Sequence, residues 1–411
     1  MEKTVFTKEM VGEYTILVPP MFPIHERLLL PLVSEWGYNM KMITNDGPSV
    51  MCKGLNFCHN DTCYPAQVCI GEMIDCIESG EYDPHKIAFL ITQTGGGCRA
   101  SNYISLMRKA LDNAGYNFVP IISLNFKADL EKSAFKFTVP MLIRMGYFLL
   151  VGDLLMTLKN QVKPYETEKG AADAMVDKWI DEVIRRYPKE KHMKYTDLIK
   201  CYREIIRDFK TIETKKPEKR TRVGIVGEIF VKFSPYGNNH LEDFLIEEGA
   251  EPVLGGVLDF ILYCVSNGVT DAKLYGTRKL KAFGCKILTK VLCEMQKGLR
   301  SVIGEESNFN PMPSFYNLMK ARDNFISMGV KMGEGWLLTA EMLDFCEEGV
   351  NNIVCTQPFG CLPNHIIGKG MIKGVREKFP NSNIVAIDYD FSNTKANQEN
   401  RLKLMLANAK A

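Results

Sequence analysis

Cysteines are the residues of this 411-residue chain best suited to chemistry, and there are 13 of them. Six lie within apolar helical or strand-like patterns and are expected to be small buried side chains; these are Cys69, Cys76, Cys201, Cys264, Cys293 and Cys346. Six others lie in or near predicted loops; these are Cys52, Cys58, Cys63, Cys98, Cys355 and Cys361. The N-terminus shows no apolar secretion signal, so we expect a reducing compartment in which structural disulfides are rare. The loop cysteines therefore need another role.

Three of the loop cysteines occupy the same kind of position. Cys98 follows a predicted strand, 85–93, in the segment QTGGGCRASNY and stands before a helix. Cys361 follows a second predicted strand, 350–357, through PFG and also precedes a helix, and Cys63 stands directly before a third helix. Ligands of open α/β sheets bind beyond the carboxyl ends of the strands, where helix N-termini point. We therefore expect the three thiols to belong to one site.

The chemistry of this position favours an iron–sulfur cluster. A helix N-terminus lowers the pKa of a thiol and stabilises an anionic partner through its free N–H groups. A thiolate-ligated cluster is anionic, and its sulfides accept backbone hydrogen bonds. The glycines at 95–97 and Gly360 would allow the backbone to approach such a group closely.

Other readings of the same residues stay open. Zinc sites commonly use CxxC pairs, whereas this chain has C-x4-C and C-x5-C spacings and no CxxC, which also disfavours a thioredoxin-like pair. Cys98 could be a lone nucleophile with His59 or His365 as its base. TGGGCR lacks the G-K-[ST] ending of a P-loop. The glycines and the cysteine could also form a tight strand–helix turn with no chemical role.

Further residues in these loops are second-tier candidates. Additional thiol ligands would come from Cys58 and Cys355, which share loops with Cys63 and Cys361, and less readily from Cys285. Polar side chains that could donate to sulfides or to a substrate are Arg99, Asn102, His59, Gln357, His365, Glu228 and Lys232. Caps, turns and salt bridges explain these polar residues equally well. Asp388 and Asp390 end a predicted strand, but two alternating carboxylates do not specify a metal.

The elements that must position these residues alternate between strand and helix. The predicted strands are 13–19, 38–44, 85–93, 116–123, 222–230, 251–256, 350–357 and 383–390. The predicted helices between and after them are 25–37, 64–80, 99–115, 241–250, a stretch to about 300, 336–349, 362–380 and the last 18 or so residues. This alternation predicts parallel βαβ units.

We therefore predict an α/β protein with two Rossmann-like or flavodoxin-like parallel-sheet domains and an intervening charged helical segment. The N-terminal domain would span 1–150 and contain the Cys63 and Cys98 loops. The helical segment and a polar linker around Pro217 would span 151–221, and the second domain, with the Cys361 loop, would span 222–411.

Composition excludes some classes of protein. The chain is 46% hydrophobic and 24% charged with a net charge of +2, and it has no basic stripe with interleaved aromatics, so nucleic-acid binding is not expected. The most apolar stretch, 137–158, contains Arg144, Asp153 and Pro140 and is predicted to be a buried core helix, not a membrane span. We expect a soluble, cytoplasmic protein.

Three segments resemble one protein family. NDTCYPA (60–66), TQTGGGCRASNY (92–103) and QPFGCLPNH (357–365) are similar to motifs of the 2-hydroxyacyl-CoA dehydratase superfamily, including its activator-associated and double-cubane cluster branch. The segments 224–251 and 383–407 resemble the C-terminal part of long-form dehydratase activators. The resemblance covers nearly the whole chain.

The resemblance implies a function and a set of ligands. Proteins of this family bind cubane iron–sulfur clusters between α/β domains, and the matching cysteines here are Cys63, Cys98 and Cys361. They would hold a [4Fe-4S] cluster, leaving one iron for substrate, water or a sulfide bridge to a second cubane in an [8Fe-9S] double cubane. In the dehydratases, one electron forms a ketyl radical on the acyl-CoA so that an unactivated hydroxyl can leave; in the double-cubane proteins, the cluster reduces small molecules.

The resemblance also implies partners. A separate ATP-dependent activator would deliver low-potential electrons under anaerobic conditions, and its nucleotide-binding domain is absent from this sequence. The substrate would be a small molecule or an acyl-CoA, although no CoA-specific motif is recognised. The protein would work as a homo- or heterodimer, either as the catalyst or as a non-catalytic electron-transfer subunit.

Overall fold

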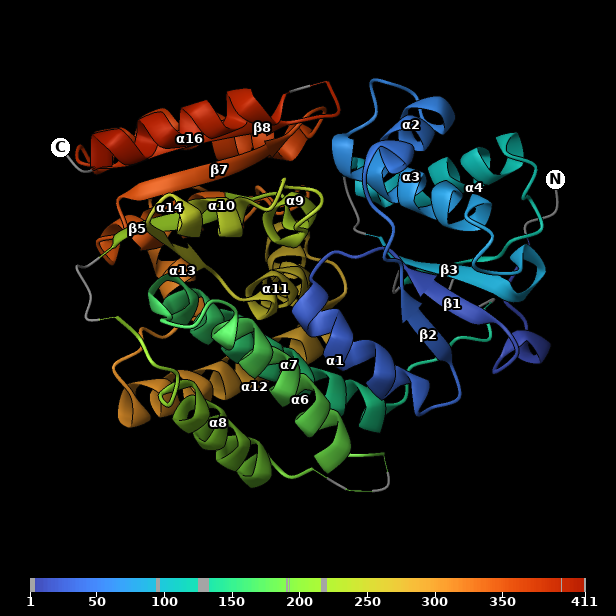
Figure 1. Ribbon diagram of the computed structural model, residues 1–411, viewed down its shortest axis with the longest axis horizontal. Helices are drawn as coiled ribbons and strands as arrows, with labels where there is room; N and C mark the ends of the chain where they lie inside the picture. Colours follow the sequence, from blue (N-terminus) through green and yellow to red (C-terminus); the bar gives the residue numbers. More distant parts are fainter. Residues whose placement is uncertain are drawn as a thin grey trace.

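The computed structural model describes residues 4–93, 97–124, 133–189, 191, 193–215, 220–392 and 394–409. It contains two four-stranded, fully parallel sheets. Figure 1 shows the N-terminal sheet in blue at the right and the C-terminal sheet at the upper left, with the two chain ends on opposite sides. The predicted α/β fold with two parallel-sheet domains is confirmed.

The first sheet has the strand order β2-β1-β3-β4. Its strands are β1 (Thr15–Val18), β2 (Asn39–Met42), β3 (Ile87–Thr92) and β4 (Ile121–Leu124). The helices of this domain are α1 (Pro23–Ser34), α2 (Pro48–Phe57), α3 (Tyr64–Glu78) and α4 (Tyr103–Asn113), with a 3-10 turn, η3 (Arg99–Asn102), ahead of α4.

The second sheet has the order β6-β5-β7-β8. Its strands are β5 (Thr221–Gly227), β6 (Ala250–Leu254), β7 (Asn352–Pro358) and β8 (Asn383–Tyr389). Its helices are α9 (Ile229–Phe233), α10 (Leu241–Glu247), α13 (Phe315–Ala321), α14 (Trp336–Glu347), a π-turn η5 (Asn364–Gly368), α15 (Ile372–Lys378) and α16 (Lys395–Ala409).

The two sheets have the same topology, because each places its second strand at one edge, then its first, third and fourth. In such a sheet the strand order reverses between the first and third strands. Ligands of α/β proteins bind beyond the carboxyl ends of the strands at this topological switch point. These points lie at β1/β3, next to the Cys98 loop, and at β5/β7, next to Glu228 and the Cys361 loop.

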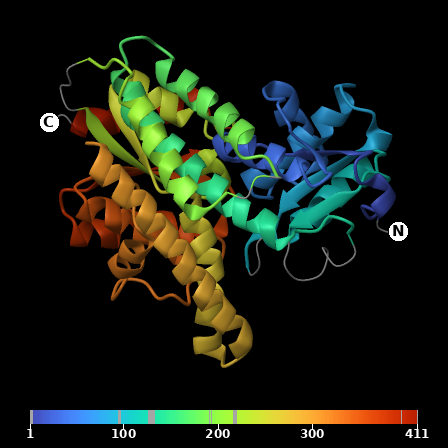
Figure 2. The same ribbon diagram turned by 90° about the horizontal axis from the view of Figure 1, so that it is seen from below.

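A layer of long helices lies beside the sheets (Figure 1). It contains α6 (Val139–Val162), α7 (Ala171–Arg186), α8 (Tyr195–Phe209), α11 (Val257–Tyr275) and α12 (Lys279–Glu306). Figure 2 shows α11 and α12 as a hairpin whose far end projects away from the rest of the molecule. Because α6 runs through residue 150, the proposed division at 150/151 falls inside one helix.

The apolar segment 137–158 is a core helix, as predicted. Among the described residues, one helix, Val139–Tyr165, is long and apolar enough to cross a membrane, but 67% of its most apolar window is buried. Its two central charges are buried with partners: Arg144 donates to Glu35 (2.8 Å) and Asp153 accepts from His25 (2.9 Å). This burial is that of a core helix packed between the elements of an α/β fold.

Two predictions of local structure differ from the result. Helix α2 lies where a loop was expected; it packs through glycine against α3, since a Cβ on Gly54 would lie 2.5 Å from the Gln67 carbonyl oxygen. The single helix expected at 362–380 is divided into η5, a 3-10 turn and α15, because glycines interrupt it. The centre of the linker, Pro217, lies outside the described residues.

Candidate functional site

The Cys63 and Cys361 loops meet where the two domains touch. The Tyr64 N–H donates to the Phe359 carbonyl across this seam at 2.9 Å. Gly360 has φ +69°, and a Cβ at that position would lie 3.1 Å from Cys63 Cα. Only glycine fits both the backbone conformation and the contact without strain. Both thiols are buried, so the two cysteines lie at a closed domain seam.

Cys98 lies at the same domain seam, beside the loop that precedes α14. The position of a Cβ on Gly333 lies 3.8 Å from Cys98 Sγ and 3.0 Å from Pro363 Cγ, two residues after Cys361. Gly97 is equally close-packed, since a Cβ there would lie 2.4 Å from Met332 Sδ. The loop before α14 therefore lies between the Cys98 and Cys361 loops. Gly95 and Gly96 lie outside the described residues.

Each of the three thiols faces a backbone N–H at the start of a helix or turn. These N–H groups belong to Ala66, Ala100 and Asn364, and each lowers the pKa of its cysteine. For Cys98 the hydrogen bond is explicit, with Ala100 N donating to Sγ over 3.4 Å. The expected helix N-terminal contribution is therefore present at all three positions.

Burial nevertheless outweighs these hydrogen bonds. It raises the pKa of Cys63 to about 11 and that of Cys98 to about 12, and it raises the pKa of Cys361 further still. The helix N-terminal contribution is therefore present, but the net pKa of each thiol is raised in the protein alone. A buried thiol stays protonated unless a cation stabilises its thiolate, so thiolate chemistry here requires a positively charged group.

Two buried carboxyl groups lie among the thiols. Glu228 ends β5 and caps α9 by accepting from the Val231 N–H (2.9 Å), and Glu334 accepts from the Ile229 N–H (3.1 Å). Burial raises both pKa values; the nearby Glu334 raises that of Glu228 further, and Glu341 raises that of Glu334. Both acids in turn raise the pKa of Cys98 and Cys361. We call Cys63, Cys98, Cys361, Glu228 and Glu334 the seam cluster.

Two members of this region were not found from the sequence. Glu334 lies in a predicted loop, and its signal was the pair of flanking glycines, Gly333 and Gly335, which both have positive φ. Tyr103 is buried and its hydroxyl lies 3.6 Å from Cys63 Sγ. Its only sequence signal was its place at the end of the Cys98 segment, where it reads as an ordinary first-turn residue.

The second-tier candidates lie at varied distances from the cluster. Cys58 is half-buried, and its thiolate raises the pKa of Cys63, so it is within electrostatic range. Cys355 is fully buried inside β7, with Sγ 3.6 Å from Asn364 Oδ1. Cys285 lies on α12 against Gly268, in the hairpin. The structure therefore brings Cys58 towards the cluster and places the other two in packing positions.

The polar candidates mostly serve local structure. Arg99 and Asn102 are exposed on η3, and His59 is exposed beside Asp61. His365 Nδ1 lies 2.6 Å from Gln357 Nε2 and 2.7 Å from the Cys361 carbonyl oxygen, so this pair fixes the Cys361 loop. Lys232 is buried in an ion pair with Glu341 (2.7 Å).

The three cysteines lie near one another but do not form a site for a single metal ion. Over the ranges that the structure describes, no three His, Cys, Asp or Glu side chains converge closely enough to hold one metal ion. The three cysteine thiols are close enough for Cys98 to raise the pKa of Cys361 and Cys63 to raise that of Cys98.

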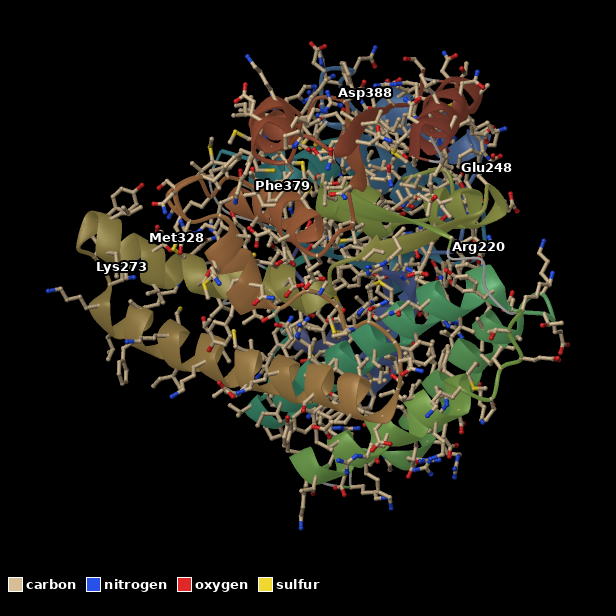
Figure 3. The ribbon with its side chains drawn as sticks, turned by 90° about the vertical axis from the view of Figure 1, so that its left-hand side faces the viewer. Arg220, Glu248, Lys273, Met328, Phe379 and Asp388 are labelled. Carbon is tan, nitrogen blue, oxygen red and sulfur yellow. The ribbon has the colours of Figure 1, made fainter. Side chains whose placement is uncertain are left out.

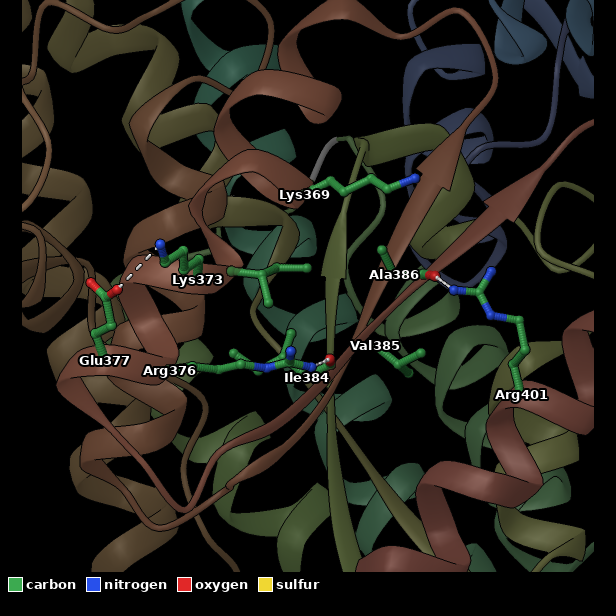
Figure 4. Close-up of a pocket in the computed structure, with 9 residues that line it drawn as sticks. Lys369, Lys373, Arg376, Glu377, Ile384, Val385, Ala386 and Arg401 are labelled. Carbon is green, nitrogen blue, oxygen red and sulfur yellow. Dashed lines mark hydrogen bonds and ion pairs between the residues drawn. The ribbon is translucent and has the colours of Figure 1, made fainter.

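Grooves elsewhere carry none of the three cysteines. The larger, about 590 Å³, lies over the edge strand β8 and contains four cations, which are Lys369, Lys373, Arg376 and Arg401. Figure 4 shows Arg376 and Arg401 reaching the outer carbonyl oxygens of Ile384 and Ala386. Capped edge carbonyls protect a sheet from pairing with another strand, so these arginines have a structural explanation.

Fold and site together define a two-domain α/β protein with a buried cluster of thiols and acids at its seam. No protein-family model matches the sequence, and no curated protein matches it. Any function must therefore be argued from the residues themselves.

Proposed function

We propose that this chain is an iron–sulfur protein that receives low-potential electrons from an ATP-dependent activator and reduces a small molecule or dehydrates a 2-hydroxyacyl-CoA. Cys63, Cys98 and Cys361 would hold a [4Fe-4S] cluster, or one half of a double cubane. When bound, the cluster supplies one-electron reduction at low potential. A reducing, anaerobic cytoplasm suits both the free cysteines and such a cofactor.

The observation that carries this proposal is the meeting of three cysteines, far apart in sequence, at one seam. Each thiol has a backbone N–H group beside it. The sulfur atoms of an iron–sulfur cluster accept hydrogen bonds from such groups. The raised thiol pKa values are also consistent, because iron would supply the positive charge that three buried thiolates and two nearby acids lack.

The remaining residues have supporting roles in this proposal. The Tyr103 hydroxyl lies 3.6 Å from Cys63 Sγ and would donate to its thiolate. Gly360 lets its loop approach the Cys63 backbone closely, and Gly333 lets the loop before α14 approach Cys98 and Pro363. Cys58 is placed to serve as a further ligand if a second cubane is present.

The direct test is to count iron and acid-labile sulfide in anaerobically purified protein. We expect about four or eight of each per chain, with a broad thiolate-to-iron absorption near 400 nm. Cys98→Ala should lose most of the iron, whereas the matched control Cys52→Ala, at an exposed position on α2, should keep it. Full iron content in Cys98→Ala, or none in the wild type after anaerobic reconstitution, would refute the assignment.

A second function is favoured by the closure of the seam. Cys63 and Cys361 are only 4% and 5% exposed, which leaves little room for a substrate at the thiols. A non-catalytic electron-transfer subunit needs no such room. If candidate substrates leave the EPR signal of the reduced cluster unchanged, and turnover appears only with a partner subunit, this alternative is correct.

A further inference from the structure

Helix α12 has two apolar faces on opposite sides, and one of them is bare. The inner face packs towards α11 and consists of Ala282, Cys285, Thr289, Leu292, Cys293 and Gln296. The contact is close, since a Cβ on Gly268 of α11 would lie 2.7 Å from Cys285 Sγ. This face alone explains why the hairpin forms.

The outer face continues the apolar pattern into solvent. Leu280, Phe283, Ile287 and Val291 recur at intervals of three or four residues, which places them on one side of the helix. They are between 50% and 86% exposed. Figure 2 shows that this part of α12 lies in the projecting arm, and Figure 3 shows side chains standing out from it near the labelled Lys273. A contiguous bare apolar stripe on an exposed helix marks an interaction surface.

One flank of this stripe carries a row of lysines. Lys279, Lys286, Lys290 and Lys297 lie seven, four and seven residues apart, so they align along the helix, and all are exposed. The sequence of α12 contains one acid, Glu294, before Glu305. The row therefore places positive charge beside the apolar stripe, and α12 has few acids to neutralise that charge.

This charge pattern argues against a second copy of the chain as the occupant. In a two-fold antiparallel pair of α12 helices, each flank of one helix lies against the same flank of the other. The two lysine rows would therefore lie against each other. In a parallel pair the lysine row would face the opposite flank, which carries Lys281 and Leu288 and no acid. Like charges in such positions are destabilising.

The pattern also differs from that of a membrane-binding helix. An apolar stripe that enters a bilayer has lipid headgroups on both sides, and basic residues are then expected on both flanks of the polar face. Here four lysines lie on one flank, and the other flank carries Lys281 alone. A one-sided row suits a partner helix that lies alongside α12 and has its own acids on one edge.

We propose that the outer face of α12 is the docking site for an acidic amphipathic helix of a partner protein. Leu280, Phe283, Ile287 and Val291 would fill the apolar seam of the pair, and the lysine row would face the partner's carboxylates. Apolar anchors supply most of the affinity of such a contact, and the charges supply orientation and rate. The proposal stands apart from the iron–sulfur function and does not depend on it.

The test uses the full-length protein and a fluorescently labelled helical peptide with leucines along one stripe and glutamates on its flanks. Fluorescence anisotropy should show saturable binding that weakens with added salt. Ile287→Glu should weaken binding about tenfold or more, as expected for loss of a central apolar anchor. Ile143→Glu is the matched control, because Ile143 on α6 is 51% exposed, close to the 50% of Ile287, and should leave binding unchanged.

The electrostatic part has its own variant. The double variant Lys286→Glu, Lys290→Glu should bind the acidic peptide more weakly and with less dependence on salt. It should bind more tightly to a peptide whose glutamates are replaced by lysines. Circular dichroism should show that these exposed substitutions leave the fold intact.

Four results would overturn the proposal. The first is no binding of the acidic peptide to the wild type, and the second is equal binding of the acidic and lysine-flanked peptides. The third is a concentration-dependent dimer in light scattering that Ile287→Glu abolishes, which would assign the face to a second copy. The fourth is Ile287-dependent sedimentation with vesicles of phosphatidylcholine containing about a quarter phosphatidylserine, which would assign it to a membrane.

Discussion

Two buried polar regions of this molecule contrast in how their groups are paired. One is the seam cluster. The other, which we call the paired network, lies between the helical layer and the second sheet and consists of His25, Asp153, Lys232, Asp259, Gln296 and Glu341. Both regions take charged or polar side chains out of water, so both carry a desolvation cost.

In the paired network each group has a partner. Asp153 accepts from His25 at 2.9 Å and also caps α11 through the Val257 N–H at 2.7 Å. Lys232 and Glu341 form an ion pair at 2.7 Å. Asp259 accepts from Gln296 at 2.7 Å and from the Gly256 N–H at 3.1 Å.

The seam cluster is less well paired. Among the described residues, Glu334 Oε2 has no hydrogen-bond partner. Burial and Glu228 raise the pKa of all three thiols, and Glu334 also raises those of Cys98 and Cys361. In the part of the chain that the structure describes, Glu72 on α3 also has both carboxyl oxygens buried without a partner, whereas every group of the paired network has one. The contrast indicates that buried polar groups without hydrogen-bond partners point to function more than buried polar groups in general do.

The largest effect is expected from breaking the ion pair of the paired network. Lys232→Met leaves Glu341 buried without its cation and should lower the free energy of unfolding by about 3–5 kcal/mol, measured by urea denaturation. Adding Glu341→Gln removes the uncompensated charge and should recover much of the loss. A single-variant loss below about 1 kcal/mol would mean that Lys232 is not a structural partner and that the contrast with the seam is false.

A somewhat smaller loss is expected at the cap of α11. Asp153→Ala removes the acceptor of two helix N–H groups, Val257 and Leu258, and leaves His25 buried without a partner. We expect a loss of about 2–4 kcal/mol in the same measurement. Asp177→Ala is the control, because Asp177 pairs with Arg27 at the exposed surface and should change stability by less than about 0.5 kcal/mol. Similar losses in both variants would show that burial of Asp153 is not what matters.

The contrast also separates what the sequence could predict from what it could not. The alternating apolar runs predicted all eight strands, because buried parallel strands have a strong local signal. The residues at strand ends, including Cys98, Cys361 and Glu228, could be placed because topology brings those ends together. Helix α2 was missed because Gly54, which its packing on α3 requires, lowers helix propensity.

Contacts between distant segments could not be predicted. Glu334 lies about a hundred residues from Glu228, and the pairing of His25 with Asp153 joins α1 to α6 across 128 residues. The local hydrophobic periodicity of the sequence contains no information about such long-range pairs. The raised thiol pKa values were also missed, since helix starts are visible in the sequence whereas the depth of burial depends on how two domains close.

At the seam itself, Gly360 tests how tightly the loops must approach. Gly360→Ala should cost about 1–3 kcal/mol, since Ala must adopt φ +69° and its Cβ would lie 3.1 Å from Cys63 Cα. Gly80→Ala is the matched control, because Gly80 has φ +76° with no atom near the added Cβ, and it should show only the backbone cost of about 1 kcal/mol. Iron content should fall in Gly360→Ala alone; equal iron in both variants would mean that the Cys63 and Cys361 loops need not touch.

The smallest effect concerns the under-paired acids, and its sign follows from their raised pKa values. In the metal-free chain, burial holds the Glu334 pKa above its ordinary value of 4.5, so the folded state binds more protons than the unfolded state above that pH. Stability should therefore fall as pH rises above that value. Glu334→Gln removes one titrating group and relieves Glu228, so the slope should flatten by up to about 1.4 kcal/mol per pH unit. Glu182→Gln is the control, since the surface pair with Arg185 and Arg186 lowers the Glu182 pKa to about 2, so that it titrates outside this window. Parallel curves for the wild type and Glu334→Gln would show that the seam acids are satisfied after all, and the contrast between the two regions would fail.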